Sequence, residues 1–110
     1  MERPLRGDIV VINFPHSDLT TYKKRPAFVV KVPKGEDIIV CQITATSSEK
    51  SVEISLSDDE FEQGKLKMQS NIRIDKIFSV EKSMIDYKIG HLKKEKVKDI
   101  LDKVGLFLKS

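Results

Sequence analysis

Two apolar stretches, Ala27–Val32 (AFVVKV) and Asp37–Ile43 (DIIVCQI), decide the fold of this 110-residue chain. Both are rich in β-branched residues, which favour extended strands. The segment Pro33-Lys34-Gly35-Glu36 separates them, and its proline and glycine supply the backbone angles of a tight reversal. The two stretches are therefore predicted to pair as an antiparallel hairpin.

Further strands are predicted on both sides of this hairpin. Asp8–Phe14 is expected to alternate around Val10, Ile12 and Phe14, as a half-buried strand does. The same alternation covers residues 52–56 and returns in Ser70–Val80. In the last segment the alternation changes phase at Lys76-Ile77, which indicates a bulge or a bend.

Helical signals are confined to two places. Ser57 followed by three acidic residues predicts one capped helical turn that ends before Gly64. Apolar residues recur at helical spacing near the end of the chain and predict a helix from about Lys93 to Leu108. The stripe expected to face the sheet consists of Val97, Ile100, Leu101, Val104 and Leu108. The fold class expected is mainly β, a strongly bent antiparallel sheet or small barrel covered by this helix, in a single domain over residues 1–110.

Composition limits the possible functions. Charged residues make up 34% of the chain, and no apolar run approaches the roughly 18 residues of a membrane helix. No signal peptide is apparent at the N-terminus, so a cytoplasmic protein is expected. The lone Cys41 excludes an internal disulfide and a cysteine-rich zinc site, and its apolar neighbours predict a buried side chain. The net charge of +3 leans toward acidic partners but does not by itself identify them.

Two polar features stand at predicted strand ends. A polar segment, residues 16–24, is expected to form a surface loop that ends at Arg25-Pro26. The run Thr44-Ala45-Thr46-Ser47-Ser48 closes the second strand of the hairpin. A guanidinium and several hydroxyls placed in this way suit the binding, and possible cleavage, of phosphodiesters.

Seven short motifs give the sequence a resemblance to a known family. In chain order they are Gly7-Asp8-Ile9-Val10, Phe14-Pro15, Arg25-Pro26-Ala27, Gln42-Ile43-Thr44, Gly64–Leu66, Ser70 with Arg73-Ile74-Asp75-Lys76-Ile77, and Ile89-Gly90-His91-Leu92. Their order and spacing resemble those of the MazF/PemK toxins of bacterial and archaeal toxin–antitoxin systems.

The resemblance implies a fold and an activity. It implies an SH3-like barrel that forms a homodimer and acts as an mRNA interferase. Such an enzyme cleaves single-stranded RNA sequence-selectively through the 2′-hydroxyl, without a metal or another cofactor. It also implies a cognate antitoxin protein that occupies the RNA groove.

Arg25 and Thr44 are the first candidates for catalysis. Arg25 would stabilise charge on the phosphoryl oxygens, because a guanidinium offers a planar fork to phosphate and stays charged. The resemblance places a catalytic or positioning hydroxyl at Thr44. Ala45 stands where a serine often follows in the family, so Thr46 and Ser47 are the alternative hydroxyls, unless they only form a strand-end turn.

Arg73 and Asp75 match positions with acid–base or binding roles in part of the family. Two residues apart on one strand, they face the same side, so the alternative is a simple ion pair. His16 is a second candidate base because a histidine titrates near neutrality, although an ordinary loop histidine is the alternative interpretation. The remaining substrate-binding candidates are Lys23, Lys24 and Ser70.

Two other functions stay open. One is a catalytically inactive module that binds RNA or protein on the same barrel. The other is a gyrase-targeting toxin of the CcdB type, which shares the fold but relies on a tryptophan near its C-terminus. This chain has no tryptophan and ends in Leu108-Lys109-Ser110, which argues against the gyrase target.

Overall fold

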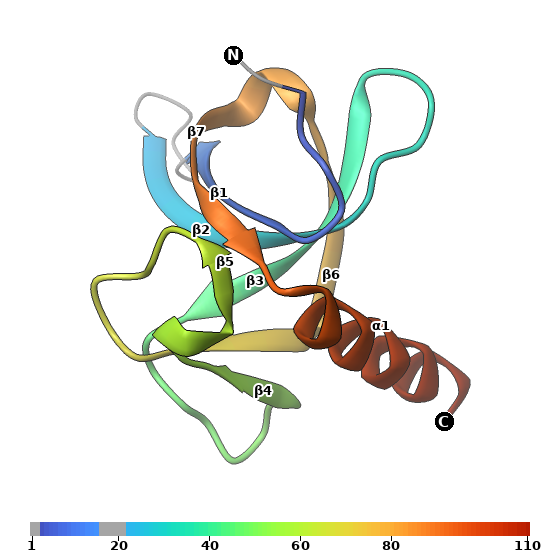
Figure 1. The fold of residues 1–110 in the computed structure, drawn as a ribbon. Helices are drawn as coiled ribbons and strands as arrows, with labels where there is room; N and C mark the ends of the chain where they lie inside the picture. Colours follow the sequence, from blue (N-terminus) through green and yellow to red (C-terminus); the bar gives the residue numbers. More distant parts are fainter. Residues whose placement is uncertain (1–2, 16–21) are drawn as a thin grey trace.

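The computed structural model describes residues 3–15 and 22–110, which form one antiparallel sheet and a C-terminal helix (Figure 1). The strands are β1 (Asp8–Pro15), β2 (Tyr22–Lys31), β3 (Asp37–Thr44), β4 (Glu53–Leu56), β5 (Phe61–Gln63), β6 (Ser70–Glu81) and β7 (Ile85–Leu92), and the helix is α1 (Lys94–Lys109). Single 3-10 turns at Asp58–Glu60 and Lys82–Met84 precede β5 and β7. The fold class predicted from the sequence is confirmed.

The strands are ordered β4-β6-β3-β2-β1-β7-β5 across the sheet. In the described chain β4 and β5 are edges that do not pair with each other, so the sheet is strongly bent but not a closed barrel. β2 and β3 form the predicted hairpin, with Ala27 opposite Gln42 and Val29 opposite Val40. The predicted bulge is also present, because β6 passes from Arg73 to Ile77 while β3 advances by one residue.

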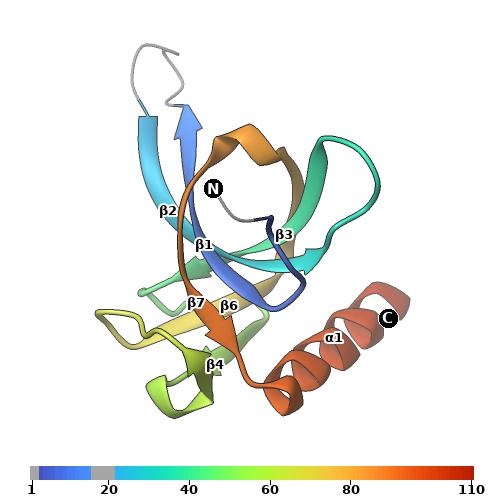
Figure 2. The same ribbon diagram turned by 45° about the horizontal axis from the view of Figure 1, so that its top comes forward.

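Apolar side chains fill both faces of the sheet. Ile9, Phe28 and Cys41 belong to a cluster on the face that α1 covers with Ile100 and Val104. A second cluster on the other side contains the following strand residues: Val10, Ile12, Ala27, Val29 and Val40. β1 contributes to both clusters, so the expectation that it is half-buried was wrong. Figure 2 shows α1 running along one side of the sheet beyond β7.

Some predicted boundaries were also wrong. β2 begins at Tyr22, because it pairs with β1 back to Pro15, and so Lys23 and Lys24 belong to a strand rather than to a loop. α1 matches the predicted helix, but Leu108 is 66% exposed and Phe107 packs against the core instead. β5 and β7 were not predicted, since their short apolar patterns depend on pairing with distant strands.

Candidate nucleic-acid interface

Arg25 and Thr44 lie on one face of the sheet, where β2 and β3 separate. The β2–β3 pairing ends at Ala27 and Gln42. Arg25 and Thr44 are each two residues beyond this pair, so the two-residue period of a strand points both side chains to the same face. Beyond Thr44, which pairs with Asn71, the chain leaves the sheet. The two leading catalytic candidates therefore face the same side of the sheet, on the two strands that separate at this margin.

Arg25 is half-buried at this margin. Its partner on β1 is Ile12, whose side chain is buried in the second apolar cluster. Among the described residues Arg25 forms no ion pair and no side-chain hydrogen bond. A guanidinium beside apolar neighbours and without a carboxylate partner is suited to bind an anion from solution.

The Thr44 hydroxyl closes a local turn. Its Oγ1 donates to the carbonyl oxygen of Thr46 at 3.1 Å and accepts from the Thr46 backbone nitrogen at 3.1 Å. This is the strand-end turn that the sequence offered as an alternative, formed by Thr44 itself. The turn is exposed, so the hydroxyl can exchange its carbonyl acceptor for a phosphate oxygen.

Arg73 and Asp75 form a bidentate ion pair on β6. Arg73 Nε donates to one carboxylate oxygen of Asp75 at 3.1 Å, and Nη2 donates to the other at 2.8 Å. Arg73 pairs with Gln42 across β3, so its side chain shares the face of Arg25 and Thr44. The hydrogen bonds from Arg73 hold the pKa of Asp75 below its ordinary value. Asp75 is therefore an ionised carboxylate whose two oxygens are both engaged.

Glu53 organises the loop that follows Thr44. Its carboxylate accepts from the hydroxyls of Ser47 and Ser51 and from the backbone nitrogen of Ser48. Glu53 pairs with Arg73 on β4 and β6, which places it on the same face of the sheet. The bond from Ser51 chiefly lowers the pKa of Glu53. The sequence did not predict this role, because Ser47 and Ser48 reach Glu53 only once the loop is closed.

Most of the other described candidates already have partners within the protein. Ser47 is held by Glu53, and Thr46 is held through its backbone by Thr44. Lys23 is exposed on β2. Lys24 forms an ion pair with Asp86 at 2.7 Å, and this bond raises the pKa of Lys24. Ser70 is buried, and its hydroxyl donates to the carbonyl oxygen of Met68. His16 lies outside the described residues.

A groove on the opposite face of the sheet adjoins this margin. It has a volume of about 570 Å³ and is called here the lysine groove. Its lining residues are Val11, Lys24, Pro26, Ile43, Ala45, Lys65, Leu66, Lys67, Met68, Ser70, Tyr87, Lys88 and Ile89. Lys24 and Pro26 flank Arg25 in the sequence, and Ala45 follows Thr44. Of these residues the sequence pointed to Lys24 and Ser70 as site candidates, but not to the lysines of residues 64–69 or to Tyr87.

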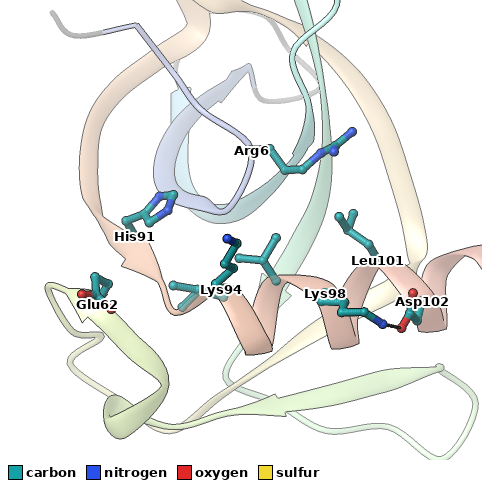
Figure 3. A pocket seen from close by; sticks show the side chains of 9 residues that line it. Arg6, Glu62, His91, Lys94, Lys98, Leu101 and Asp102 are labelled. Carbon is teal, nitrogen blue, oxygen red and sulfur yellow. Dashed lines mark hydrogen bonds and ion pairs between the residues drawn. The ribbon is translucent and has the colours of Figure 1, made fainter.

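A second cleft, of about 560 Å³, separates the N-terminal segment from α1 (Figure 3). Figure 3 shows Arg6 on that segment and Lys94 and Lys98 on the helix, with Lys98 bonded to Asp102. His91 also lines this cleft, where its Nδ1 lies 2.7 Å from the buried Asp8 carboxylate. None of the described site candidates lines it. The cleft carries charges of both signs.

The described residues contain neither a cluster of metal-ligating side chains nor a helix that could span a membrane. They contain no group of three or more histidine, cysteine, aspartate or glutamate side chains arranged to hold a metal ion. No helix in the described part of the chain is both long and apolar enough to cross a membrane.

Comparison with solved structures finds the same fold in toxins and endoribonucleases. The MazE-MazF complex from Deinococcus radiodurans (Form-III) is 18% identical, with a TM-score of 0.75 and 96% of each chain covered. Mycobacterium tuberculosis toxin MazF-mt6 is 20% identical, with a TM-score of 0.66 over 88% of this chain and 90% of that chain. An endoribonuclease in complex with its cognate antitoxin from a Mycobacterial species is 15% identical, with a TM-score of 0.66 over 93% of this chain and 94% of that chain.

At these identities the structural matches establish the fold alone. No curated protein matches the sequence. A family model does match, over residues 5–108. The chain therefore belongs to the family of PemK-like, MazF-like toxins of type II toxin–antitoxin systems.

Proposed function

We propose that this toxin is a metal-independent endoribonuclease that cleaves single-stranded mRNA sequence-selectively in the cytoplasm. The observation that carries the proposal is the placement of Arg25 and Thr44 on one face at the margin where β2 and β3 separate. Family membership and the fold shared with endoribonucleases support this activity. Neither the inactive binding module nor the gyrase-targeting toxin receives such support.

Cleavage in this mechanism uses the 2′-hydroxyl of the RNA as the nucleophile. The Arg25 guanidinium binds the non-bridging oxygens of the scissile phosphate and stabilises the negative charge that develops there. The Thr44 hydroxyl gives up its hydrogen bond to the Thr46 carbonyl oxygen and donates a hydrogen bond to a phosphate oxygen instead. The 2′-oxygen attacks the phosphorus while a base takes its proton, and the bond from phosphorus to the 5′-oxygen breaks. The products are a 2′,3′-cyclic phosphate and, once the departing oxygen is protonated, a 5′-hydroxyl. Charge stabilisation by Arg25 takes the place of a metal ion.

Arg73 and Asp75 have a positioning role in the proposal. Both oxygens of Asp75 are engaged by Arg73, and the lowered pKa makes Asp75 a weak proton acceptor. The pair holds the Arg73 guanidinium on the substrate face, where its remaining N–H groups can donate to a phosphate. Lys23, Lys24, Thr46, Ser47 and Ser70 are the further substrate-binding candidates, and His16 is the candidate base.

Cleavage in excess EDTA tests the proposal. Purified protein free of antitoxin is incubated with a long single-stranded RNA, and the fragment ends are analysed. We expect discrete fragments with cyclic-phosphate or 3′-phosphate ends and 5′-hydroxyl ends. Arg25→Ala should lower the rate about 100-fold or more, as expected for loss of a group that stabilises transition-state charge. Lys34→Ala, in the exposed hairpin turn, is the control. Intact RNA with the folded wild-type protein would contradict the proposal.

The salt dependence of binding tests separately whether the RNA contacts the basic residues Lys23, Lys24 and Arg25. Changing Lys23, Lys24 and Arg25 together to alanine should weaken binding to a single-stranded RNA. It should also reduce the slope of log K against log salt by about 0.7 for each phosphate that no longer has a basic partner. An unchanged affinity and slope would show that the RNA lies elsewhere.

Assembly is the last part of the proposal. We propose that the toxin forms a homodimer and that a cognate antitoxin protein covers its RNA-binding surface. The Mycobacterial endoribonuclease and the Deinococcus radiodurans protein were both solved with an antitoxin, which supports the second statement. Light scattering on the purified toxin should give the mass of two chains, and a mass of one chain would contradict the dimer.

A further inference from the structure

The lysine groove has a positively charged rim and an apolar floor. Four of its thirteen lining residues are lysines, and none is an aspartate or glutamate. Lys24 forms an ion pair with Asp86 at 2.7 Å, and Lys88 forms one with Asp8 at 3.3 Å. In the part of the chain that the structure describes, Lys65 and Lys67 are exposed and form no ion pair. These two lysines are available to an anion from solution.

The mouth of the groove carries two large apolar side chains. Tyr87 on β7 is 51% exposed, although most large apolar residues of the sheet are buried, and Met68, in the segment before β6, is 65% exposed. Tyr87 pairs with Val11 across β7 and β1, which anchors its backbone in the sheet. A half-exposed aromatic ring beside cations is the combination on which unpaired nucleobases stack in single-strand-binding proteins.

The position of the groove connects it to the candidate catalytic margin. Pro26 and Ile43 line the groove from the strands that carry Arg25 and Thr44 on the other face. Because successive residues of a strand are only about 3.3 Å apart along it, the groove lies close in space to Arg25 and Thr44, although it opens on the other face. The volume of about 570 Å³ lies within the usual size of ligand pockets, about 300–1,000 Å³.

We propose that the lysine groove binds an unpaired nucleobase of the RNA substrate next to the cleavage site. This inference rests on the proposed function and adds a substrate subsite to it. The base stacks on Tyr87 above the apolar floor, and its flanking phosphates contact Lys65 and Lys67. Tyr87 and the two lysines are thus substrate-binding residues that contribute to affinity and to the choice of cleavage site.

Binding of a non-cleavable RNA isolates this subsite from catalysis. The probe is a fluorescent single-stranded RNA with 2′-O-methyl groups, which lack the nucleophile, and affinity is measured by anisotropy. Tyr87→Leu keeps an apolar side chain but removes the ring, and should weaken binding about 10-fold. Tyr87→Phe keeps the ring and should bind as the wild type does. Circular dichroism shows that each variant is folded.

The lysines are tested by the double variant Lys65→Gln/Lys67→Gln. The loss of two lysine–phosphate contacts should lower the slope of log K against log salt by about 1.4. The double variant Lys34→Gln/Lys109→Gln removes the same charge from exposed positions outside the groove, so its slope should stay close to that of the wild type. Inorganic polyphosphate serves as a second probe, because it has the charge of RNA but no base. Its binding should weaken in the Lys65→Gln/Lys67→Gln variant and not in Tyr87→Leu.

The possible outcomes separate this inference from the proposed function. Wild-type affinity in both groove variants, with RNA cleavage intact, overturns the subsite and leaves the nuclease. Equal loss of RNA binding in Tyr87→Leu and Tyr87→Phe, or no loss in either, overturns the stacking role. Tight binding of an acidic peptide that depends on the groove, with RNA binding independent of it, makes the groove a protein site. A wild-type protein that neither binds nor cleaves RNA refutes both proposals.

Discussion

Asp8 shows at the scale of a single residue how a buried charge is accommodated. It is fully buried at the start of β1. Its Oδ1 lies 2.7 Å from His91 Nδ1 and 3.3 Å from Lys88 Nζ, and its Oδ2 accepts from the Leu5 backbone nitrogen at 2.8 Å. A buried carboxylate requires such partners, because it has left its hydration shell. Asp8 therefore ties the N-terminal segment and β7 to the start of β1.

Asp8→Asn is predicted to destabilise the protein by about 1–3 kcal/mol, because Lys88 and His91 lose the charge that faces them. Urea unfolding at neutral pH measures the change. Asp37→Asn, at the exposed start of β3, is the matched control and should change stability by less than about 0.5 kcal/mol. Equal stability of the two variants would show that the Asp8 cluster contributes little.

Cys41 is predicted to be chemically inert in the folded protein. Its side chain is fully buried in the cluster beneath α1, and burial raises the pKa of its thiol to about 12. The reactive thiolate is therefore scarce and inaccessible at neutral pH. Titration with a thiol reagent such as DTNB should give no reaction with the native protein and one thiol per chain in concentrated guanidinium chloride. Rapid reaction of the native protein would disprove this burial.

At the scale of elements, the β5–β7 pairing depends on a close approach of two backbones. Gly64 follows β5 with φ of +85°, a conformation that other residues rarely adopt. A side chain there would meet the carbonyl oxygen of Ile89 on β7. Gly105, within α1, differs because an added Cβ would meet nothing within 4 Å. Since Gly64 leads into Lys65 and Lys67, this close approach also positions the rim of the lysine groove.

The two glycines are predicted to respond in opposite directions to alanine. Gly64→Ala should destabilise the protein by at least about 1–2 kcal/mol, from the left-handed backbone together with the steric clash. Gly105→Ala should stabilise it by about 0.5–1 kcal/mol, because alanine reduces the backbone freedom lost on helix formation. Thermal and urea unfolding of both variants measure these changes. A loss of stability in Gly105→Ala would mean that another surface packs on this side of α1.

At the scale of the whole molecule, ionised carboxylates link the loops to the sheet. Asp75, Glu53 and Glu60 all have pKa values below their ordinary ones. The hydrogen bonds from Arg73 are the main cause of the lowered pKa of Asp75, and the hydrogen bond from Ser51 is the main cause of the lowered pKa of Glu53. Burial alone would raise the pKa of Glu60, but its bonds to Lys96 and Ser57 lower it overall. The ammonium group of Lys96 on α1 lies 2.8 Å from the Glu60 carboxylate.

Stability is predicted to fall in acid because of these groups. Their lowered pKa values mean that the unfolded state takes up protons first, so their contribution is complete above the ordinary values of 3.8 for Asp75 and 4.5 for the two glutamates. It is lost as the pH falls through the lower folded values. Urea unfolding of Asp75→Asn over this pH range should show a weaker dependence than the wild type. Asp37→Asn is the control, and parallel curves for all three proteins would contradict the role of Asp75.

Local patterns in the sequence were sufficient to predict the β-rich fold class and the hairpin of β2 and β3. They also predicted the bulge in β6, the helix α1 and the burial of Cys41. Alternation and helical spacing report which side of an element is apolar, and this depends only on neighbouring residues. The family and the candidates Arg25 and Thr44 were also available from the order of short motifs. By contrast, β1 was expected to be half-buried, because alternation does not reveal that the bent sheet encloses apolar clusters on both of its faces.

Tertiary structure alone decided the rest of the site. Glu53 meets the hydroxyl of Ser47 and the backbone nitrogen of Ser48 only when the loop after Thr44 folds back onto β4. The lysine groove brings together residues from β1, β2, β3, β7 and the segment after Gly64, which are far apart in the sequence. Strand order and the open edges of the sheet likewise follow from long-range pairing. A residue's own neighbours in the chain determine its local conformation, whereas a binding surface forms from side chains that only the folded sheet brings together.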